Sequence, residues 1–173
     1  MIGINTVISK YNVKKIPTIY EFVTKEIRPD SYICEVAEQR AKLYNLNLNI
    51  TPKYENVLRF LIKKLKDQHD KNKTFNLKNK LRIEFYENLL SGKNIDCYCG
   101  FSSVNIMPNG DVWLCYVKKS NIGNLRKTNY NFEKIWLNKK AEKERERVKK
   151  CKYPCKLVNA FYTNFIFNKP FII

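Results

Sequence analysis

The chain has 173 residues, of which 44% are hydrophobic and 28% are charged. This composition excludes a wholly disordered chain and suits one modest core, or one small domain with an attached fragment. The formal net charge of +17 fits a nucleic acid or another polyanion as partner. Abundant Lys, Asn and Ile also fit AT-rich codons, so we expect no nucleic-acid binding and keep it only as an alternative.

The N-terminus lacks the basic start, apolar run and small-residue cleavage site of a signal peptide. The apolar tail, residues 158–173, is shorter than the ~20 residues that a membrane span requires. Six cysteines in such a chain favour metal ligation over disulfides. We therefore expect a cytoplasmic protein without a membrane partner.

The first 47 residues predict a βαβ unit. Ile2–Ser9 has the pattern of a buried strand, Asn12 is placed to cap a helix that runs to about Ile27, and Ser31–Val36 has the pattern of a second strand. A βαβ unit implies a parallel sheet.

Two helices should follow as a connector. Thr51 is placed to cap the first, with Pro52 at its first position and apolar residues at helical spacing up to Leu65. The second runs from about Leu77 to Leu90 and stops near Gly92. Further on, residues 132–150 predict a third helix whose charged second half faces solvent.

Between these helices, residues 97–115 read CYCGFSSVNIMPNGDVWLC and predict a β-hairpin. Phe101–Ile106 alternates like a strand, residues 108–111 are turn-forming, and Val112–Leu114 resumes the strand pattern. Gly110 suits a positive φ in that turn. The hairpin should bring Cys97 and Cys115 together.

A second cysteine pair, Cys151 and Cys155, encloses a three-residue loop in which Pro154 opposes continued helix. The two pairs could meet at one metal centre. Four thiolates suit zinc or an iron-sulfur cluster, and spacing alone does not decide between these. No carboxylate pair, nucleophile-base pair or glycine-rich phosphate loop is present, so hydrolytic or acid-base catalysis has no support.

The same stretch resembles the SPASM/twitch auxiliary-cluster domain of radical S-adenosylmethionine enzymes. Twelve residues separate Cys97 from Gly110 and four more lead to Cys115, the spacing expected in that family. Residues 122–125 (IGNL) and 132–136 (FEKIW) resemble the segment that precedes the family's last cysteines. The likeness covers about residues 95–157.

The resemblance implies one 4Fe-4S cluster of the shorter twitch type, with zinc as the alternative. The implied ligands are Cys97, Cys115, Cys151 and Cys155, and Cys99 is an alternative to Cys97. Ligation by four cysteines leaves no open iron, which implies electron transfer or structural support.

The first segment resembles, more weakly, the fifth and sixth strands of the radical S-adenosylmethionine partial barrel. The chain has no C-x-x-x-C-x-x-C triad, and Cys34 stands alone as a buried strand residue. By itself the chain should therefore not be catalytic. It would bind S-adenosylmethionine only if an N-terminal partner completed a split enzyme, whose substrate would be a peptide, a protein or a small molecule. Met1 directly precedes a barrel-like strand, which supports a truncated or split chain.

These inferences combine into an α+β fold. We expect a fragment of a partial (β/α) barrel at 1–50, a helical connector at 51–92, a hairpin-plus-helix cluster domain at 93–157 and an apolar tail at 158–173. Two alternatives remain: a zinc-stabilised basic protein that binds nucleic acid, and a non-functional remnant of a split gene.

Overall fold

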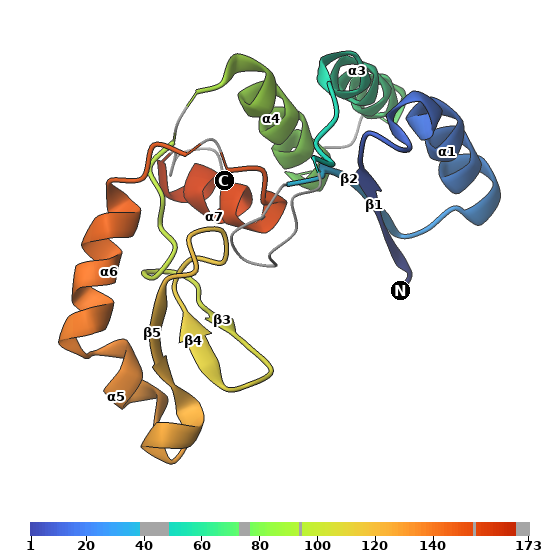
Figure 1. Ribbon diagram of the computed structural model, residues 1–173. Coiled ribbons are helices and arrows are strands. Elements are labelled where there is room, and N and C mark those ends of the chain that lie inside the picture. The colour runs from blue at the N-terminus through green and yellow to red at the C-terminus, as the bar shows by residue number, and fades with distance from the viewer. Residues whose placement is uncertain (39–48, 73–76, 94, 154, 169–173) are drawn as a thin grey trace. The chain divides into compact units, whose positions relative to one another are not determined.

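The computed structural model describes residues 1–38, 49–72, 77–93, 95–153 and 155–168 (Figure 1). It has helices together with two small sheets and no closed barrel, which confirms the α+β class. The chain divides into two compact units. The first comprises residues 1–93 with 156–158, and the second comprises residues 94–155 with 159–173.

The first unit begins with the predicted βαβ arrangement. Strands β1 (Gly3–Ile8) and β2 (Ser31–Val36) pair in parallel, from Gly3 opposite Ser31 to Ile8 opposite Val36. The connection contains three consecutive helical segments: η1 (Val13–Lys15), α1 (Ile16–Phe22) and the π-helical η2 (Val23–Ile27). The expected parallel pair is thus confirmed.

The predicted cap at Asn12 is wrong. Its side chain makes no capping bond to the helix. Instead Asn12 Oδ1 accepts from the Ser9 amide at 2.7 Å, and Asn12 Nδ2 donates to the Val7 carbonyl at 2.8 Å. The residue closes the turn that follows β1, because that turn leaves both strand-end groups within its reach.

Helices α3 (Glu55–Asn72) and α4 (Leu77–Ser91) complete the first unit. α3 begins later than predicted, because the Thr51 hydroxyl donates to the Ala37 carbonyl at 3.2 Å and does not cap the helix. α4 has the predicted bounds to within one residue and is followed by Gly92 with a φ of 63°. The core contains apolar side chains from all these elements: Ile8, Ile16, Leu58, Leu61 and Phe85.

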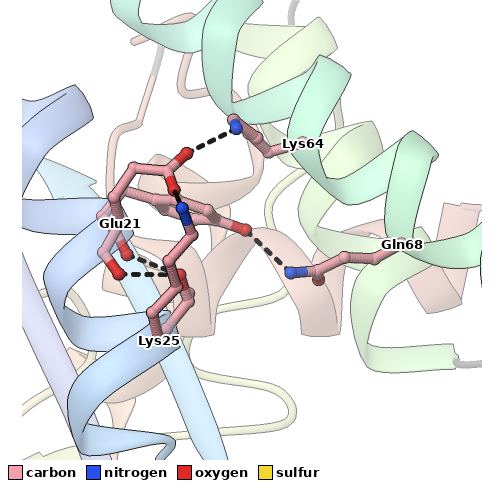
Figure 2. A network of polar contacts seen from close by, with 6 residues as sticks. Glu21, Lys25, Lys64 and Gln68 are labelled. Carbon is pink, nitrogen blue, oxygen red and sulfur yellow. Dashed lines mark hydrogen bonds and ion pairs between the residues drawn. The ribbon is translucent and has the colours of Figure 1, made fainter.

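Polar contacts join α3 to α1 (Figure 2). Lys64 Nζ forms an ion pair with Glu21, which also binds Lys25 at 2.7 Å. One turn further along α3, Gln68 Nε2 donates to the Tyr20 hydroxyl at 3.2 Å. These contacts fix the register of the two helices beside the apolar core.

The second unit holds the three-stranded antiparallel sheet β3-β4-β5. Its strands are short: Asn105–Ile106, Asp111–Trp113 and Asn121–Asn124. The β3-β4 hairpin confirms the predicted one, and Gly110 has the expected positive φ, 88°. The predicted strand from Phe101 is too long, because residues 98–103 form a turn in which two amides donate to the Tyr98 carbonyl.

Figure 1 shows two short helices that run along β5. After η3 (Leu125–Thr128), the predicted third helix is divided into α5 (Phe132–Trp136) and α6 (Lys139–Lys149). The division occurs at Asn138, whose side chain accepts from the Ala141 amide at 2.7 Å and so begins a new helix. The sheet and both helices share one apolar core: Val112, Leu114, Ile122, Ile135 and Ala141.

The last helix among the described residues is α7 (Val158–Asn168), which lies in the segment that sequence analysis describes as an apolar tail. Phe161, Asn164 and Phe165 are buried along it. Among the helices that the structure describes, none combines the length and the apolar character that a membrane crossing requires.

Candidate metal centre

Cys115 lies at the end of β4, where the chain turns sharply. The Leu114 amide donates to the Ser120 carbonyl at 2.9 Å, and the Ser120 amide returns to the Cys115 carbonyl at 3.1 Å. These bonds close a loop around the cysteine. The Lys118 amide points at Cys115 Sγ from 3.4 Å. Backbone donors of this kind favour a thiolate over a thiol at that sulfur.

Cys97 lies immediately before the turn 98–103. Within this turn Gly100 has a φ of 83°, and its amide donates to the Ser103 carbonyl at 2.9 Å. A Cβ at Gly100 would lie 2.8 Å from Leu114 Cδ1, so only glycine allows the turn to approach β4 this closely. The glycine thus places the Cys97 segment beside the residue that precedes Cys115.

Arg145 of α6 holds the same turn from the other side. Its Nε donates to the Gly100 carbonyl at 2.6 Å, and its terminal nitrogen donates to the Trp136 carbonyl at 2.6 Å. The guanidinium also lies 4.4 Å from the centre of the Trp136 ring, a cation-π distance. Arg145 therefore joins the turn after Cys97 to α5 and α6.

Three of the four predicted ligands surround one cavity of about 240 Å³: Cys97, Cys115 and Cys151. The rest of its lining is mostly cationic: Lys118, Arg147, Lys152 and the buried Val148. Arg147 is held in place by the Ser120 hydroxyl at 2.8 Å and by Glu144 at 2.7 Å. Cations beside thiolates lower the free energy of an anionic centre.

The fourth predicted ligand, Cys155, does not line this cavity, and Pro154 beside it lies outside the described residues. Cys151 follows α6 directly, and its amide donates to the Val148 carbonyl at 3.0 Å. Within the described part of the chain, no three Cys, His, Asp or Glu side chains converge closely enough to hold a single metal ion.

The cysteines have strongly different pKa values in this arrangement. The pKa of Cys97 is lowered to about 6, chiefly because the Cys99 thiol donates to it, with help from the Cys99 amide and the Asn164 side chain. The pKa of Cys99 is raised by the same hydrogen bond and by burial. Burial raises the pKa of Cys115. Hydrogen bonds from the Lys118 and Val117 amides lower this pKa, but their effect is smaller than that of burial. Cys97 is therefore the thiolate at neutral pH, with Cys99 as its donor.

The sixth cysteine has the role that the sequence predicts. Cys34 lies in β2 of the first unit and is 2% exposed. Burial raises its pKa to about 11. It is a protonated core residue at neutral pH.

Residues 97–157 match the family model of SPASM, an iron-sulfur cluster-binding domain. The match covers about a third of the chain and contains all five cysteines of the second unit. It confirms the resemblance seen in the sequence and supports iron-sulfur binding by this segment. No curated protein and no solved structure shows a significant match to the chain.

One contributor to the site lies beyond the SPASM segment. Asn164 of α7 is 4% exposed, and its Oδ1 accepts from the Tyr98 amide at 2.8 Å. Its side chain also bonds to Cys97 and helps to lower the pKa of that thiol. Sequence analysis missed this role and placed Asn164 only within the apolar tail at 158–173. A single buried amide on the apolar side of a helix is the signal that could have identified it.

Proposed function

We propose that this chain binds one 4Fe-4S cluster of the twitch type through Cys97, Cys115, Cys151 and Cys155. The observation that carries the proposal is the cavity in the SPASM segment, which three of these cysteines line together. Sulfur donors suit iron-sulfur clusters, and hydrogen bonds to ligand sulfurs are a usual means of tuning them. The Lys118 amide beside Cys115 and the Asn164 amide beside Cys97 supply such bonds.

The residues around the cavity fit an anionic cluster. Thiols and cationic side chains line the cavity together, with the buried Val148 among them. With every iron bound by cysteine, the cluster would supply electron transfer or structural support. The chain's own residues would hold it, shield it and set its potential. Cys99 is the alternative to Cys97 as ligand. In the proposed arrangement the Cys99 thiol donates a hydrogen bond to the Cys97 sulfur.

The deciding experiment measures iron, zinc and acid-labile sulfide after anaerobic reconstitution, together with the visible absorption spectrum. We expect about four irons and four sulfides per chain and a broad thiolate-to-iron band. Cys115→Ala should lose most of the iron. Cys34→Ala is the matched control and should load fully, since that thiol lies in the core of the first unit. One zinc per chain and no sulfide would overturn the cluster proposal and favour the zinc-stabilised protein. Absence of any bound metal would favour a non-functional remnant of a split gene.

Cys97 and Cys99 can be separated by the same assay. If Cys97 is the ligand, Cys97→Ala should lose the cluster, whereas Cys99→Ala should retain it with an altered spectrum because the side-chain hydrogen bond to the ligand sulfur is lost. The reverse pattern would assign Cys99 as the ligand.

We further propose that the chain works as the C-terminal part of a radical S-adenosylmethionine protein, whose N-terminal part is a partner carrying the C-x-x-x-C-x-x-C triad. The first unit offers support. Its sheet has two strands among the described residues, and Ile2 and Val7 of the β1 region are 62% and 52% exposed. An open parallel pair with exposed apolar residues is suited to receiving further strands.

Co-expression with a chain that carries the triad tests this partnership. We expect the two chains to copurify and the 173-residue chain to become more soluble than it is alone. If the chain alone is a stable, monodisperse monomer and does not bind such a partner, the result would count against the split enzyme. Iron loading of the isolated chain is a separate result, so failure of the partnership would leave the cluster proposal standing.

A further inference from the structure

The first unit contains a second cavity, of about 480 Å³, which the cluster proposal does not use. Its lining residues come from α1, η2, the start of β2, α3 and α4. Its volume lies in the usual range for small-molecule sites. Three phenols and three cationic groups line it: Tyr20, Tyr32, Tyr86, Arg28, Lys78 and Arg82.

Arg82 is the central polar group of this lining. Its guanidinium donates to the Asn79 side-chain oxygen at 3.1 Å and to the Ser31 hydroxyl at 2.8 Å. Its Nε is buried and has no hydrogen-bond partner in the part of the chain that the structure describes. Asn79 and Ser31 are both neutral, so they hold the Arg82 guanidinium in place without neutralising its positive charge. Arg82 is partly exposed, and a cation that is partly withdrawn from water without a counter-ion is unfavourable, so an anion in the cavity would reduce that cost.

The charges around Arg82 favour the same ligand. Arg28 and Lys78 are exposed at the cavity rim. The lining has one carboxylate, Asp30, and it is already engaged. Its Oδ2 accepts from the Ile2 amide at 2.6 Å and lies 3.9 Å from the N-terminal ammonium. The cavity therefore presents a net positive charge to an incoming group.

The phenols supply neutral surface and one further donor. Burial raises the pKa of Tyr20 and of Tyr32, so both remain protonated in ordinary buffers. Tyr32 donates to the Thr6 hydroxyl at 3.0 Å and Tyr86 to the Cys34 carbonyl at 2.9 Å. The Tyr20 oxygen accepts from Gln68, which Figure 2 shows reaching across from α3. Within the described part of the chain no acceptor is found for the Tyr20 hydrogen, so this hydrogen can be donated to a ligand.

We propose that this cavity binds a small organic anion, through a carboxylate or a phosphate group anchored by Arg82. Guanidinium groups bind both oxyanions with paired hydrogen bonds. Tyr20 donates a further bond, and the aromatic rings cover the uncharged body of the ligand. The site lies wholly in the first unit, so it is independent of cluster binding and of the SPASM segment.

Isothermal titration of the full chain with two probes, inorganic phosphate and benzoate, tests the site. We expect saturable binding of at least one probe. Phosphate alone would assign a phosphate site, and benzoate alone would assign a carboxylate on an apolar body. Arg82→Gln should weaken binding about tenfold or more, because a charge-assisted pair is lost. Arg82→Lys keeps the positive charge but loses the planar guanidinium group. Its affinity for the probe should lie between the affinities of the wild type and of Arg82→Gln.

The matched control is Arg59→Gln, which removes the same charge from the exposed side of α3. It should bind as the wild type does. Equal weakening by both Gln variants would mean general attraction to a basic chain, and absence of saturable binding by either probe would mean no site, so either result overturns the proposal. If Arg82→Gln fails to fold, Tyr20→Phe decides: several-fold weaker binding supports the site and unchanged binding contradicts it.

Discussion

Asn164 Oδ1 accepts a hydrogen bond from the Tyr98 amide at 2.8 Å, across 66 residues of sequence. Tyr98 lies between Cys97 and Cys99, so this bond anchors the turn at residues 98–103 to α7. The contact is reinforced by the Tyr98 and Phe167 rings, which stack with centroids 4.9 Å apart, and by Asn168, which donates to the Asp96 carbonyl at 3.1 Å. α7 is therefore part of the cysteine site although it follows the SPASM segment.

Replacing Asn164 by Ala should destabilise the second unit by about 1–3 kcal/mol, because it leaves the Tyr98 amide without its acceptor. It should also speed iron release from the loaded protein and lower the reduction potential, since a hydrogen bond to the Cys97 sulfur is lost. Chemical denaturation of the metal-free chain measures the first effect, and voltammetry of the loaded chain measures the second. Asn159→Ala, an exposed change in the same helix, should alter neither.

Gly100→Ala should be costly for two reasons. The φ of 83° is unfavourable for any residue with a Cβ, and that Cβ would lie 2.8 Å from Leu114 Cδ1. We expect a loss of about 1–3 kcal/mol of stability from the backbone alone, with the clash added. Denaturant midpoints of the metal-free chain measure it.

Gly92→Ala provides the control for that prediction. Gly92 also has a positive φ, 63°, but a Cβ there would meet nothing within 4 Å. The difference in stability loss between Gly100→Ala and Gly92→Ala therefore measures the cost of a Cβ where the turn at residues 98–103 packs closely against Leu114. Equal losses would mean that Leu114 moves aside without cost.

Local chemistry explains the parts of the fold that the sequence predicts. The turn residues around Gly110 specify the hairpin, and the strand pattern of Ser31–Val36 predicts β2 with its observed bounds. Asparagine illustrates the limit of such rules. Asn124, Asn131 and Asn138 each accept a bond from a backbone amide at a helix start. Asn12 has the same side chain, yet it bonds back to β1, because tertiary context decides which backbone groups lie within reach.

The residues around the cysteines are predictable only in part. The hairpin predicts that Cys97 and Cys115 lie together, whereas the full set of four ligands is implied by the resemblance to the SPASM/twitch domain. Asn164 and Arg145 lie 66 and 45 residues from the groups that they bind, and no local pattern specifies contacts at that separation. The cavity around Arg82 likewise depends on Ser31, 51 residues away. Long-range polar contacts require the packed fold before they can be identified.

Cys34 should resist alkylation in the native protein. Its thiol is 2% exposed, and burial holds its pKa at about 11, so only about one molecule in a thousand carries the thiolate at pH 8. Iodoacetamide labelling of the metal-free chain, followed by peptide mass mapping, should modify the partly exposed Cys151 and spare Cys34 until denaturant is added. Labelling of Cys34 at the rate of Cys151 would contradict its place in the core.

Glu21 should make the first unit sensitive to acid. Its bonds to Lys25 and Lys64 lower its pKa from 4.5 to about 2. A carboxylate with a depressed pKa in the folded state stabilises that state above its unfolded pKa, and the stabilisation is lost as the pH falls from about 4.5 towards 2. The unfolding free energies of the wild type and of Glu21→Gln should therefore differ at neutral pH and converge across this window.

Denaturant unfolding between pH 2 and 7 at low salt measures that convergence. Added salt should reduce the difference at neutral pH, because the ion pairs are partly exposed. Glu26→Gln, an exposed change in the adjoining η2, should show no comparable pH-dependent gap from the wild type. If Lys64→Met removes the effect of Glu21→Gln in a double-mutant cycle, the contact between α1 and α3 shown in Figure 2 is its source. A gap that stays constant from pH 7 to pH 2 would mean that Glu21 acts through packing and not through its charge.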